Sequence, residues 1–340
     1  MKIQLVSFTN QGGQLCALLQ NELNRQGHNS VGYCKYDIDG IKPLVCDIRS
    51  FTKYAFDTCE AIIFIGAVGI AVRAIAPFVK SKQSDPAVLV IDETAKYVIP
   101  VLSGHIGGAN DLALSLSHIL SAQAIITTAT DCNDRFAVDT WALKNGCHIA
   151  NIENVKHISA AILKGEKVGL YSDFPIEGDL PGGLIFSNNT RVGICISKEE
   201  KHYFEHRLHL IPRQYVLGIG CKKNTKYDSL IDFIDSILLE YKISQYQIEA
   251  IASIDLKADE TALLGMSKEW RVPFYTYSAQ ELSLVPGDFT ESSFVKATTG
   301  VGNICERAAI KACGGKLLVN KTCRDGMTIA IAKKEWRCNF

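Results

Sequence analysis

Short apolar runs along the chain alternate with segments in which apolar residues recur at helical spacing. In the first part, apolar runs cover residues 2–8 and 61–66. Helical patterns follow them, one through Leu15, Leu19 and Leu23 and the other over residues 68–79. Strands that alternate with amphipathic helices predict an α/β fold with a mostly parallel sheet.

Two further apolar runs, residues 88–92 and 97–102, are separated by only a few polar residues. A link this short predicts an antiparallel hairpin. The residue before the first run and the residues after the second then lie at one end of the sheet. We therefore expect Asp85 to lie near Ser103 and His105.

The same hairpin places Asp92 and Glu93 at the opposite end of the sheet from His105. The stretch SGHIGGAN follows the second run. A helix with Leu112 and Leu116 on one face comes next, and then an apolar run over residues 124–128, which we interpret as a strand.

The alternation weakens in the middle of the chain and returns after it. Residues 132–213 contain short apolar runs around the turn-rich sequence DFPIEGDLPGG, and residues 214–340 resume the strand–helix alternation. We predict two Rossmann-like three-layer α/β domains with mostly parallel sheets, over residues 1–131 and 214–340. A smaller α/β module or linker over residues 132–213 joins them.

Composition narrows the class of protein. Lys and Arg together number 36, and Asp and Glu also number 36, so the chain lacks the basic excess of a nucleic-acid-binding protein. No apolar run reaches the roughly 18 residues of a membrane span. The 12 cysteines form no CxxC pair, which predicts reduced, mainly structural thiols, a cytoplasmic location and no protein metal site.

Loops that follow strands are the expected ligand-binding positions of an open α/β sheet. In the N-terminal part they supply Gly66, Gly69, Ser103, Gly104, His105, Gly107, Gly108, Asn110, Thr127, Thr128 and Asp131. With Arg73 and Asp85, several of these residues form our predicted cluster: Arg73, Asp85, Ser103, His105, Asn110 and Asp131.

Several of these residues have both a functional and a structural interpretation. His105 could act as a general acid or base at neutral pH, or it could be a surface residue or a helix cap. Gly107 and Gly108 could expose N–H groups to an anion, or only permit a turn. Arg73 could bind a carboxylate or extend to solvent, and Asp131 could cap a helix.

Ser103 and Asn110 have a simpler explanation. They are expected to cap the following helix and to form a hydrogen bond in its first turn. No GxSxG motif surrounds Ser103, which argues against a serine nucleophile.

In the C-terminal part the candidates again follow strands. Gly218 and Gly220 match a dinucleotide fingerprint incompletely, because Lys223 stands where a third glycine is required. Lys222 and Lys223 would favour a thiolate at Cys221, although a structural thiol is the alternative. The remaining candidates are Lys257 and Glu260 at a helix start, Thr298, Thr299 and Gly300 at another expected helix start, and Lys321 at a strand end.

Longer motifs now identify a family. The stretches GAVGIAVRAIAPFVKSKQSDPAVLVID, YVIPVLSGHIGGANDLA and ITTATD resemble the N-terminal part of the cobalt-precorrin-5A hydrolase (CbiG) family. In the C-terminal part, VLGIGCKKNT, IASIDLKADETALL, VPFYTYSAQEL, TTGVGNICERAA and KLLVNKT resemble the same family. The middle segment resembles it only in position and length.

The resemblance implies a hydrolase of anaerobic cobalamin biosynthesis that acts on a cobalt corrinoid. Such an enzyme opens the δ-lactone on ring A, releases the C20 two-carbon unit as acetaldehyde and yields cobalt-precorrin-5B. The cobalt belongs to the substrate, so we expect no separate cofactor. Membrane and nucleic-acid partners are not expected, while a homodimer and contacts with other pathway enzymes stay open.

Lactone opening needs an activated water and a site for the oxyanion. We assign these roles as hypotheses. His105 activates water with Asp85 or Asp131 orienting it, and N–H groups near Gly107 and Gly108, or Arg73, hold the oxyanion. Substrate carboxylates are assigned to Lys222, Lys257, Lys321 and the Thr298–Gly300 corner.

Two other functions also fit these loops. The first is a non-catalytic carrier of corrinoid intermediates, which could use the same residues. The second is a nucleotide- or phosphate-binding enzyme, against which the incomplete glycine fingerprint and the absence of GxxxxGK[ST] count.

Overall fold

Buried apolar strands form the centre of three sheets in a computed structural model, which describes residues 1–81, 84–105, 107–128, 135–289 and 291–340. The chain divides into two compact units, Met1–Thr140 and Trp141–Phe340. Within the described residues, no helix is both long and apolar enough to cross a membrane.

The first unit contains a seven-stranded sheet in the order β3-β2-β1-β4-β5-β6-β7. All neighbouring strands run parallel except β5 and β6, which form an antiparallel hairpin. The hairpin prediction is therefore confirmed. The strands are β1 (Lys2–Ser7), β2 (Asn29–Cys34), β3 (Lys42–Pro43), β4 (Ala61–Ile65), β5 (Ala87–Ile91), β6 (Tyr97–Leu102) and β7 (Gln123–Ala124).

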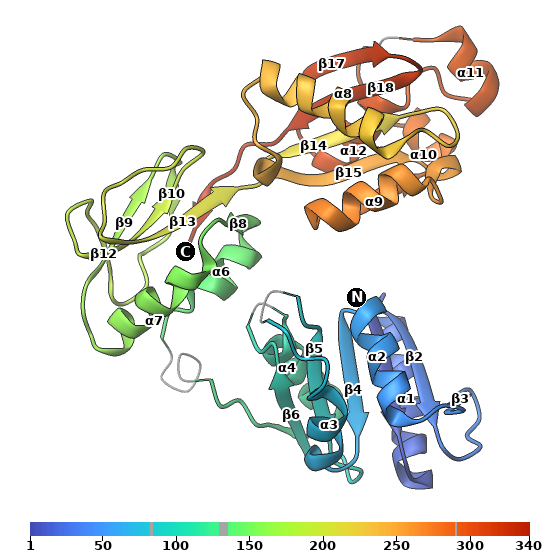
Figure 1. The fold of residues 1–340 in the computed structure, drawn as a ribbon, viewed down its shortest axis with the longest axis vertical. Coiled ribbons are helices and arrows are strands. Elements are labelled where there is room, and N and C mark those ends of the chain that lie inside the picture. The colour runs from blue at the N-terminus through green and yellow to red at the C-terminus, as the bar shows by residue number, and fades with distance from the viewer. Residues whose placement is uncertain (82–83, 106, 129–134, 290) are drawn as a thin grey trace. The chain divides into compact units, whose positions relative to one another are not determined.

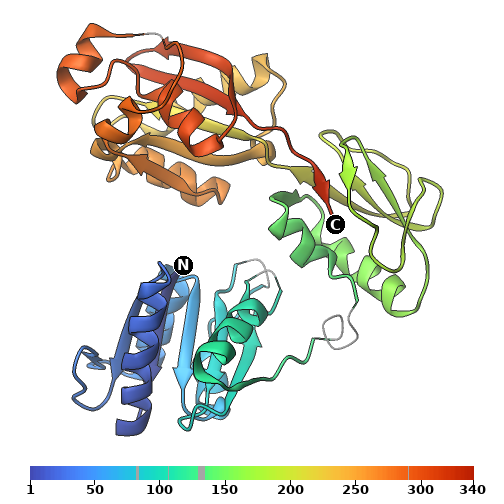
Figure 2. The same ribbon diagram turned by 180° about the vertical axis from the view of Figure 1, so that it is seen from behind.

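Helices cover both faces of this sheet (Figures 1 and 2). Leu5 and Leu89 pack with α1 (Asn10–Arg25) and α4 (Ala109–Leu120) on one face. Val6 and Val88 pack with α2 (Ile48–Thr58) and α3 (Val68–Ile75) on the other. Successive strand residues point to opposite faces, so one continuous apolar run supplies two cores.

Two predicted elements of the first unit are too long. The helix expected over residues 68–79 ends at Ile75, because Pro77 has no N–H to continue the helical hydrogen bonds. The strand expected over residues 124–128 is reduced to β7, and Ile126 packs against the core beyond its end. Helix α6 (Val138–Lys144) contains the division between the two units.

The second unit contains two larger sheets and the pair β10-β19. The first sheet has the order β11-β9-β12-β13-β8 and is parallel except for β8. The elements of this region are β8 (Cys147–Ile149), η1 (Ile152–Asn154), α7 (Val155–Leu163), β9 (Val168–Ser172), β10 (Ile176–Glu177), β11 (Leu184–Phe186), β12 (Val192–Ile196), β13 (His206–Pro212) and β19 (Cys338–Asn339).

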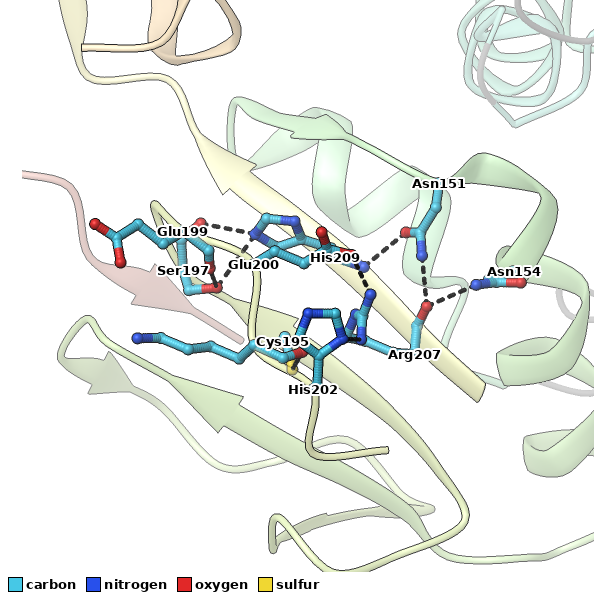
Figure 3. A network of polar contacts seen from close by, with 10 residues as sticks. Asn151, Asn154, Cys195, Ser197, Glu199, Glu200, His202, Arg207 and His209 are labelled. Atoms are coloured by element: carbon cyan, nitrogen blue, oxygen red, sulfur yellow. Dashed lines mark hydrogen bonds and ion pairs between the residues drawn. The ribbon is translucent and has the colours of Figure 1, made fainter. Parts of the chain in front are cut away.

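A buried polar network fixes this sheet (Figure 3). The His209 ring nitrogen Nε2 lies 3.2 Å from Ser197 Oγ, and the His209 N–H donates to Asn151 Oδ1 at 2.8 Å. Asn151 and Asn154 both donate to the Arg207 carbonyl oxygen. Burial lowers the pKa of His209, so the network supports a neutral ring and a structural role.

The C-terminal sheet has the order β16-β15-β14-β18-β17, in which β18 runs antiparallel to both neighbours. Helices α8 and α9 cover one face, and α10 and α12 the other (Figure 1). The elements are β14 (Tyr215–Gly220), α8 (Tyr227–Glu240), η2 (Gln245–Gln247), β15 (Ile248–Ile254), η3 (Asp255–Lys257), α9 (Thr261–Trp270), β16 (Phe274–Tyr277), α10 (Ala279–Ser283), α11 (Ser293–Thr299), α12 (Cys305–Cys313), β17 (Lys316–Arg324) and β18 (Met327–Lys333). The predicted α/β class with mostly parallel sheets is confirmed.

A stacked ring pair predicts acid sensitivity of the second unit. His148 on β8 stacks on Tyr246 at a centroid distance of 4.4 Å, and burial, with the charges of Arg213, His209 and Arg271, lowers the pKa of His148 to about 4. The unfolded chain binds a proton near the ordinary pKa of about 6.5. Between these values the unfolded state holds more protons, so stability falls as the pH drops from about 6.5 to about 4.

We expect this loss to be about 1–2 kcal/mol after allowance for solvent screening of the half-buried ring. Urea unfolding at pH 7 and pH 4.5 measures it. The variant His148→Phe keeps a ring on Tyr246 and should lose less stability on acidification than the wild type. The exposed His118, replaced by Phe, is the matched control. Equal acid sensitivity of His148→Phe and the wild type would contradict the prediction.

Candidate active site

A cavity of about 570 Å³ opens at the end of the N-terminal sheet where β6 finishes and β5 begins. We call it the His105 cavity. The β5–β6 register pairs Val88 with Leu102, which places the start of β5 beside the end of β6. The residues that the sequence predicted and that line this cavity are Asp85, Ser103, Gly104, His105, Asn110, Thr127 and Thr128.

The loop after β6 folds tightly around Ser103. Ser103 adopts a positive φ of 57°, and its Oγ donates to the Asp85 carbonyl oxygen at 3.0 Å. A Cβ on Gly107 would lie 2.4 Å from Ser103 Cβ, and one on Gly104 would lie 2.8 Å from Asn110 Oδ1. Glycine at both positions is therefore required by close packing.

His105 pairs with an acid on α6. Its Nδ1 lies 3.3 Å from Asp139 Oδ2, and the two side chains are only 14% and 9% exposed. Burial alone would raise the pKa of Asp139. The hydrogen bond and charge of His105, with the Thr140 N–H, hold that pKa below its usual value. An ionised Asp139 can therefore orient the ring, with Nδ1–H toward the carboxylate and Nε2 as the unprotonated nitrogen.

Asp139 was not among the predicted partners of His105, and Asp85, one of the two that were, contacts other groups. The carboxylate of Asp85 instead accepts the Lys80 N–H at 2.8 Å and the Ser84 hydroxyl at 3.4 Å. Asp85 thus holds the loop before β5 in place. Asp131, the other predicted partner, lies outside the described residues.

The N-terminus of α4 differs from the expected anion site. The Gly108 N–H donates to the His105 carbonyl oxygen at 2.9 Å, and the Asn110 N–H donates to the Gly104 carbonyl oxygen at 2.9 Å. The predicted oxyanion role of the Gly108 N–H is therefore wrong for this conformation. Ser103 is not the helix cap either, because Gly108 occupies that position with φ 79°.

Asn110 joins two loops at the cavity. Its side chain is 7% exposed, and its Nδ2 donates to Thr128 Oγ1 at 2.9 Å. The first turn of α4 is thereby tied to the segment after β7.

Gly66, Gly69 and Arg73 do not join the His105 cavity. Gly66 follows the carboxyl end of β4, and its N–H donates to the Ile91 carbonyl oxygen. This position is at the opposite end of the strands from Ser103. Arg73 is exposed on α3, and its guanidinium donates to the Gly69 carbonyl oxygen at 3.4 Å. The predicted cluster was wrong to include Arg73, because β6 runs antiparallel to β4 and the two strands finish at opposite ends of the sheet.

A second cavity, of about 540 Å³, lies at the carboxyl ends of β14 and β15 in the C-terminal sheet. We call it the strand-end cavity. The predicted residues that line it are Gly220, Cys221, Lys222, Lys257, Thr299 and Lys321. Glu260 adjoins it, with Oε2 at 3.3 Å from Lys257 Nζ.

Two C-terminal assignments need correction, that of Gly218 and that of the Thr298–Gly300 corner. A Cβ on Gly218 would lie 1.8 Å from the Cys305 carbonyl oxygen, so Gly218 permits α12 to pack on β14 and does not line the cavity. Thr298, Thr299 and Gly300 lie at the end of α11, because Gly300 adopts the left-handed conformation (φ 82°) that terminates a helix.

Lys321 and Cys221 also differ from expectation. Lys321 lies within β17, where the register shifts between Val319 and Thr322, and not at the end of the strand. Burial raises the pKa of the Cys221 thiol despite the lowering effect of Lys257. The thiol is thus protonated at neutral pH, and a thiolate role is not supported.

Two charged residues of the His105 cavity were not among the predicted site residues. Asp139 lies 34 positions from His105, and Lys80 lies in a stretch that resembles the family but was given no role. A polar residue in the first turn of a helix is common, so Asp139 carries no signal in a single sequence. Their proximity to His105 depends on the tertiary structure.

Comparisons with known proteins match three successive regions of the chain. Family models described as Cobalamin synthesis G N-terminal, Cobalamin biosynthesis central region and Cobalamin synthesis G C-terminus match residues 50–131, 136–212 and 215–332. The three matched regions each contain strands of one of the three larger sheets.

Individual proteins match over most of the chain. A cobalt-precorrin-5A hydrolase from Salmonella typhimurium is 35% identical over 86% of this chain and 87% of its own length. One from Priestia megaterium is 30% identical over 84% and 81%. The crystal structure of a cobalamin biosynthesis protein G homolog from Sulfolobus solfataricus covers 98% of this chain and 97% of its own, at 26% identity and a TM-score of 0.45.

The fold and the cavities define a multidomain α/β protein. It has a histidine–carboxylate pair at the strand ends of the N-terminal sheet and a lysine-lined cavity at the strand ends of the C-terminal sheet. The family models and the curated relatives make the class more specific. The chain belongs to the CbiG family, whose curated members matched here are cobalt-precorrin-5A hydrolases.

Proposed function

We propose that this chain hydrolyses cobalt-precorrin-5A in cobalamin biosynthesis, with the His105 cavity as the site of lactone opening. The family membership supports the substrate, and the His105–Asp139 pair supports the site. The reaction opens the ring A δ-lactone and releases the two-carbon unit as acetaldehyde. Both steps transfer protons and no electrons, so no redox cofactor is needed, and the cobalt enters with the substrate.

In the proposed first step, His105 Nε2 removes a proton from a water molecule as that water attacks the lactone carbonyl carbon. Asp139 stabilises the resulting imidazolium and keeps the ring oriented. When the carbon–oxygen bond of the lactone breaks, the imidazolium returns the proton to the alkoxide, which leaves a carboxylic acid and an alcohol. Lys80 lines the same cavity and supplies a positive charge for the developing oxyanion.

The variant Asp139→Asn tests the positioning role. We expect kcat to fall about 10- to 100-fold, because an amide can hold the wrong tautomer of His105. The acid limb of the kcat/KM pH profile should also move to lower pH, since loss of the neighbouring negative charge disfavours a protonated ring.

Asp139→Glu keeps the charge and should recover part of the activity and the wild-type profile. A loss of activity in Asp139→Asn without any change in the pH profile would indicate that Asp139 only supports the fold. Steady-state acetaldehyde release from pH 5.5 to 9 measures both quantities.

The carrier function makes a different prediction for the purified protein. A carrier binds the corrinoid and releases no acetaldehyde. Incubation of the protein with cobalt-precorrin-5A, followed by detection of acetaldehyde and of the mass of the corrinoid product, separates the two functions. Binding without release would overturn the proposed hydrolase activity.

A further inference from the structure

A second hollow adjoins the strand-end cavity on the C-terminal sheet. This basic groove has a volume of about 670 Å³ and lies between the start of α8 and the turn from β17 to β18. Lys222 and Met327 line both hollows, so the two adjoin at these side chains.

The charges around the two hollows are mainly positive. The basic groove is lined by Lys222, Lys223, Lys226 and Arg324, against Asp232 and Asp325. The strand-end cavity adds Lys257 and Lys321, and no carboxylate is among the described residues that line it. Since the whole chain has no net charge, this local excess favours an anionic ligand with several charges.

Gly326 leaves room for the Lys222 side chain. A Cβ on Gly326 would lie 2.3 Å from Lys222 Cε, so the lysine stem passes close to the glycine backbone. A side chain at position 326 would therefore shift Lys222 from the two hollows that it lines.

The Lys257–Glu260 pair leaves one polar atom without a partner. Glu260 Oε2 contacts Lys257, whereas Oε1 is buried and has no hydrogen-bond partner among the described residues. The Glu260 side chain is only 5% exposed. A buried acceptor without a donor destabilises the protein, and a ligand N–H or O–H would satisfy it.

The walls of the strand-end cavity are partly apolar. Ile254, Leu256, Val295 and Ile304 line it, and Leu256 is 68% exposed. Apolar walls surrounded by lysines match a ligand with an apolar ring and carboxylates at its periphery.

We propose that the strand-end cavity and the basic groove form one polycarboxylate-binding site, which holds the corrinoid by its side-chain carboxylates. The choice of a corrinoid as ligand rests on the proposed function. Lys222 and Lys257 bind carboxylates, and Glu260 accepts a hydrogen bond from the ligand.

Direct binding to the full-length protein tests this proposal. The probes are dicyanocobyrinic acid, which carries free carboxylates, and dicyanocobinamide, in which amides replace them. Equilibrium dialysis with detection of corrinoid absorbance gives the Kd of each. We expect the acid to bind at least about tenfold more tightly than the amide, with an affinity that falls as salt is raised. Equal affinities would overturn the proposal.

Lysine variants locate the site. Lys222→Gln should weaken binding of the acid about tenfold and leave binding of the amide unchanged. Lys257→Gln alone leaves Glu260 as an unpaired buried charge, so Lys257→Gln is combined with Glu260→Gln to keep the fold. Lys268→Gln, on the exposed side of α9, is the matched control. Unchanged affinity of both lysine variants for the acid would overturn the assignment.

The outcome is separable from that of the proposed hydrolysis. His105→Ala should retain the wild-type Kd for the acid although its turnover is lost. A protein that binds the acid through Lys222 and Lys257 but releases no acetaldehyde supports this site and refutes the hydrolase activity. A protein that hydrolyses the substrate, with lysine variants of unchanged KM and Kd, supports the activity and refutes this site.

Discussion

Replacing His105 by Ala is expected to lower acetaldehyde release by about 10²- to 10⁴-fold, because a positioned general base contributes that much to a proton-transfer step. The fold should be retained, since the ring lies at a cavity wall and is absent from the apolar cores. Release is measured by coupling acetaldehyde to the oxidation of NADH by alcohol dehydrogenase, and the fold is checked by circular dichroism.

The matched control is His118→Ala. His118 is exposed in the last turn of α4 and should be replaceable with little effect on turnover. If His105→Ala instead turns over at close to the wild-type rate, His105 takes no part in the chemistry. The His105 cavity would then lose its main support as the hydrolytic site.

Replacing Gly218 by Ala is expected to destabilise the second unit by about 3 kcal/mol or more. The new Cβ would lie 1.8 Å from the Cys305 carbonyl oxygen and 2.9 Å from Ala309 Cβ. The first of these contacts is with backbone, which cannot rotate away, so α12 must shift from β14. Urea and thermal unfolding followed by circular dichroism measure the loss.

Gly182→Ala is the control, because a Cβ there would meet no atom within 4 Å. The experiment also decides between two roles for Gly218. A variant with wild-type stability and selectively weakened corrinoid binding would restore the ligand-binding role that the glycine pattern predicted. Reduced stability supports the packing role that the structure gives.

The hairpin shows what pattern and spacing could predict. Two apolar runs with a short polar link have few ways to pair, and the β5–β6 register brings Ser103 to Asp85 as expected. The loop residues beside them follow by continuity of the chain. This is why Gly104, His105, Asn110 and Thr128 meet at one cavity.

The prediction failed where it depended on strand direction or on distant pairing. Arg73 was grouped with His105 because the loop before its helix follows a strand, yet β4 and β6 finish at opposite ends of the sheet. Gly300 was assigned to a helix start, although a glycine beside a helix is equally typical of its end. In both cases the local sequence is compatible with two arrangements.

The sequence by itself determined the α/β class, the hairpin and the resemblance to the CbiG family, because these depend on local periodicity and on long motifs. The tertiary structure decided that Asp139 contacts His105, that Gly218 serves packing, and that Lys222 lines two adjoining hollows. These facts depend on contacts between residues far apart in the chain. Strand register and helix packing set such contacts, and neither is encoded in the spacing of any single motif.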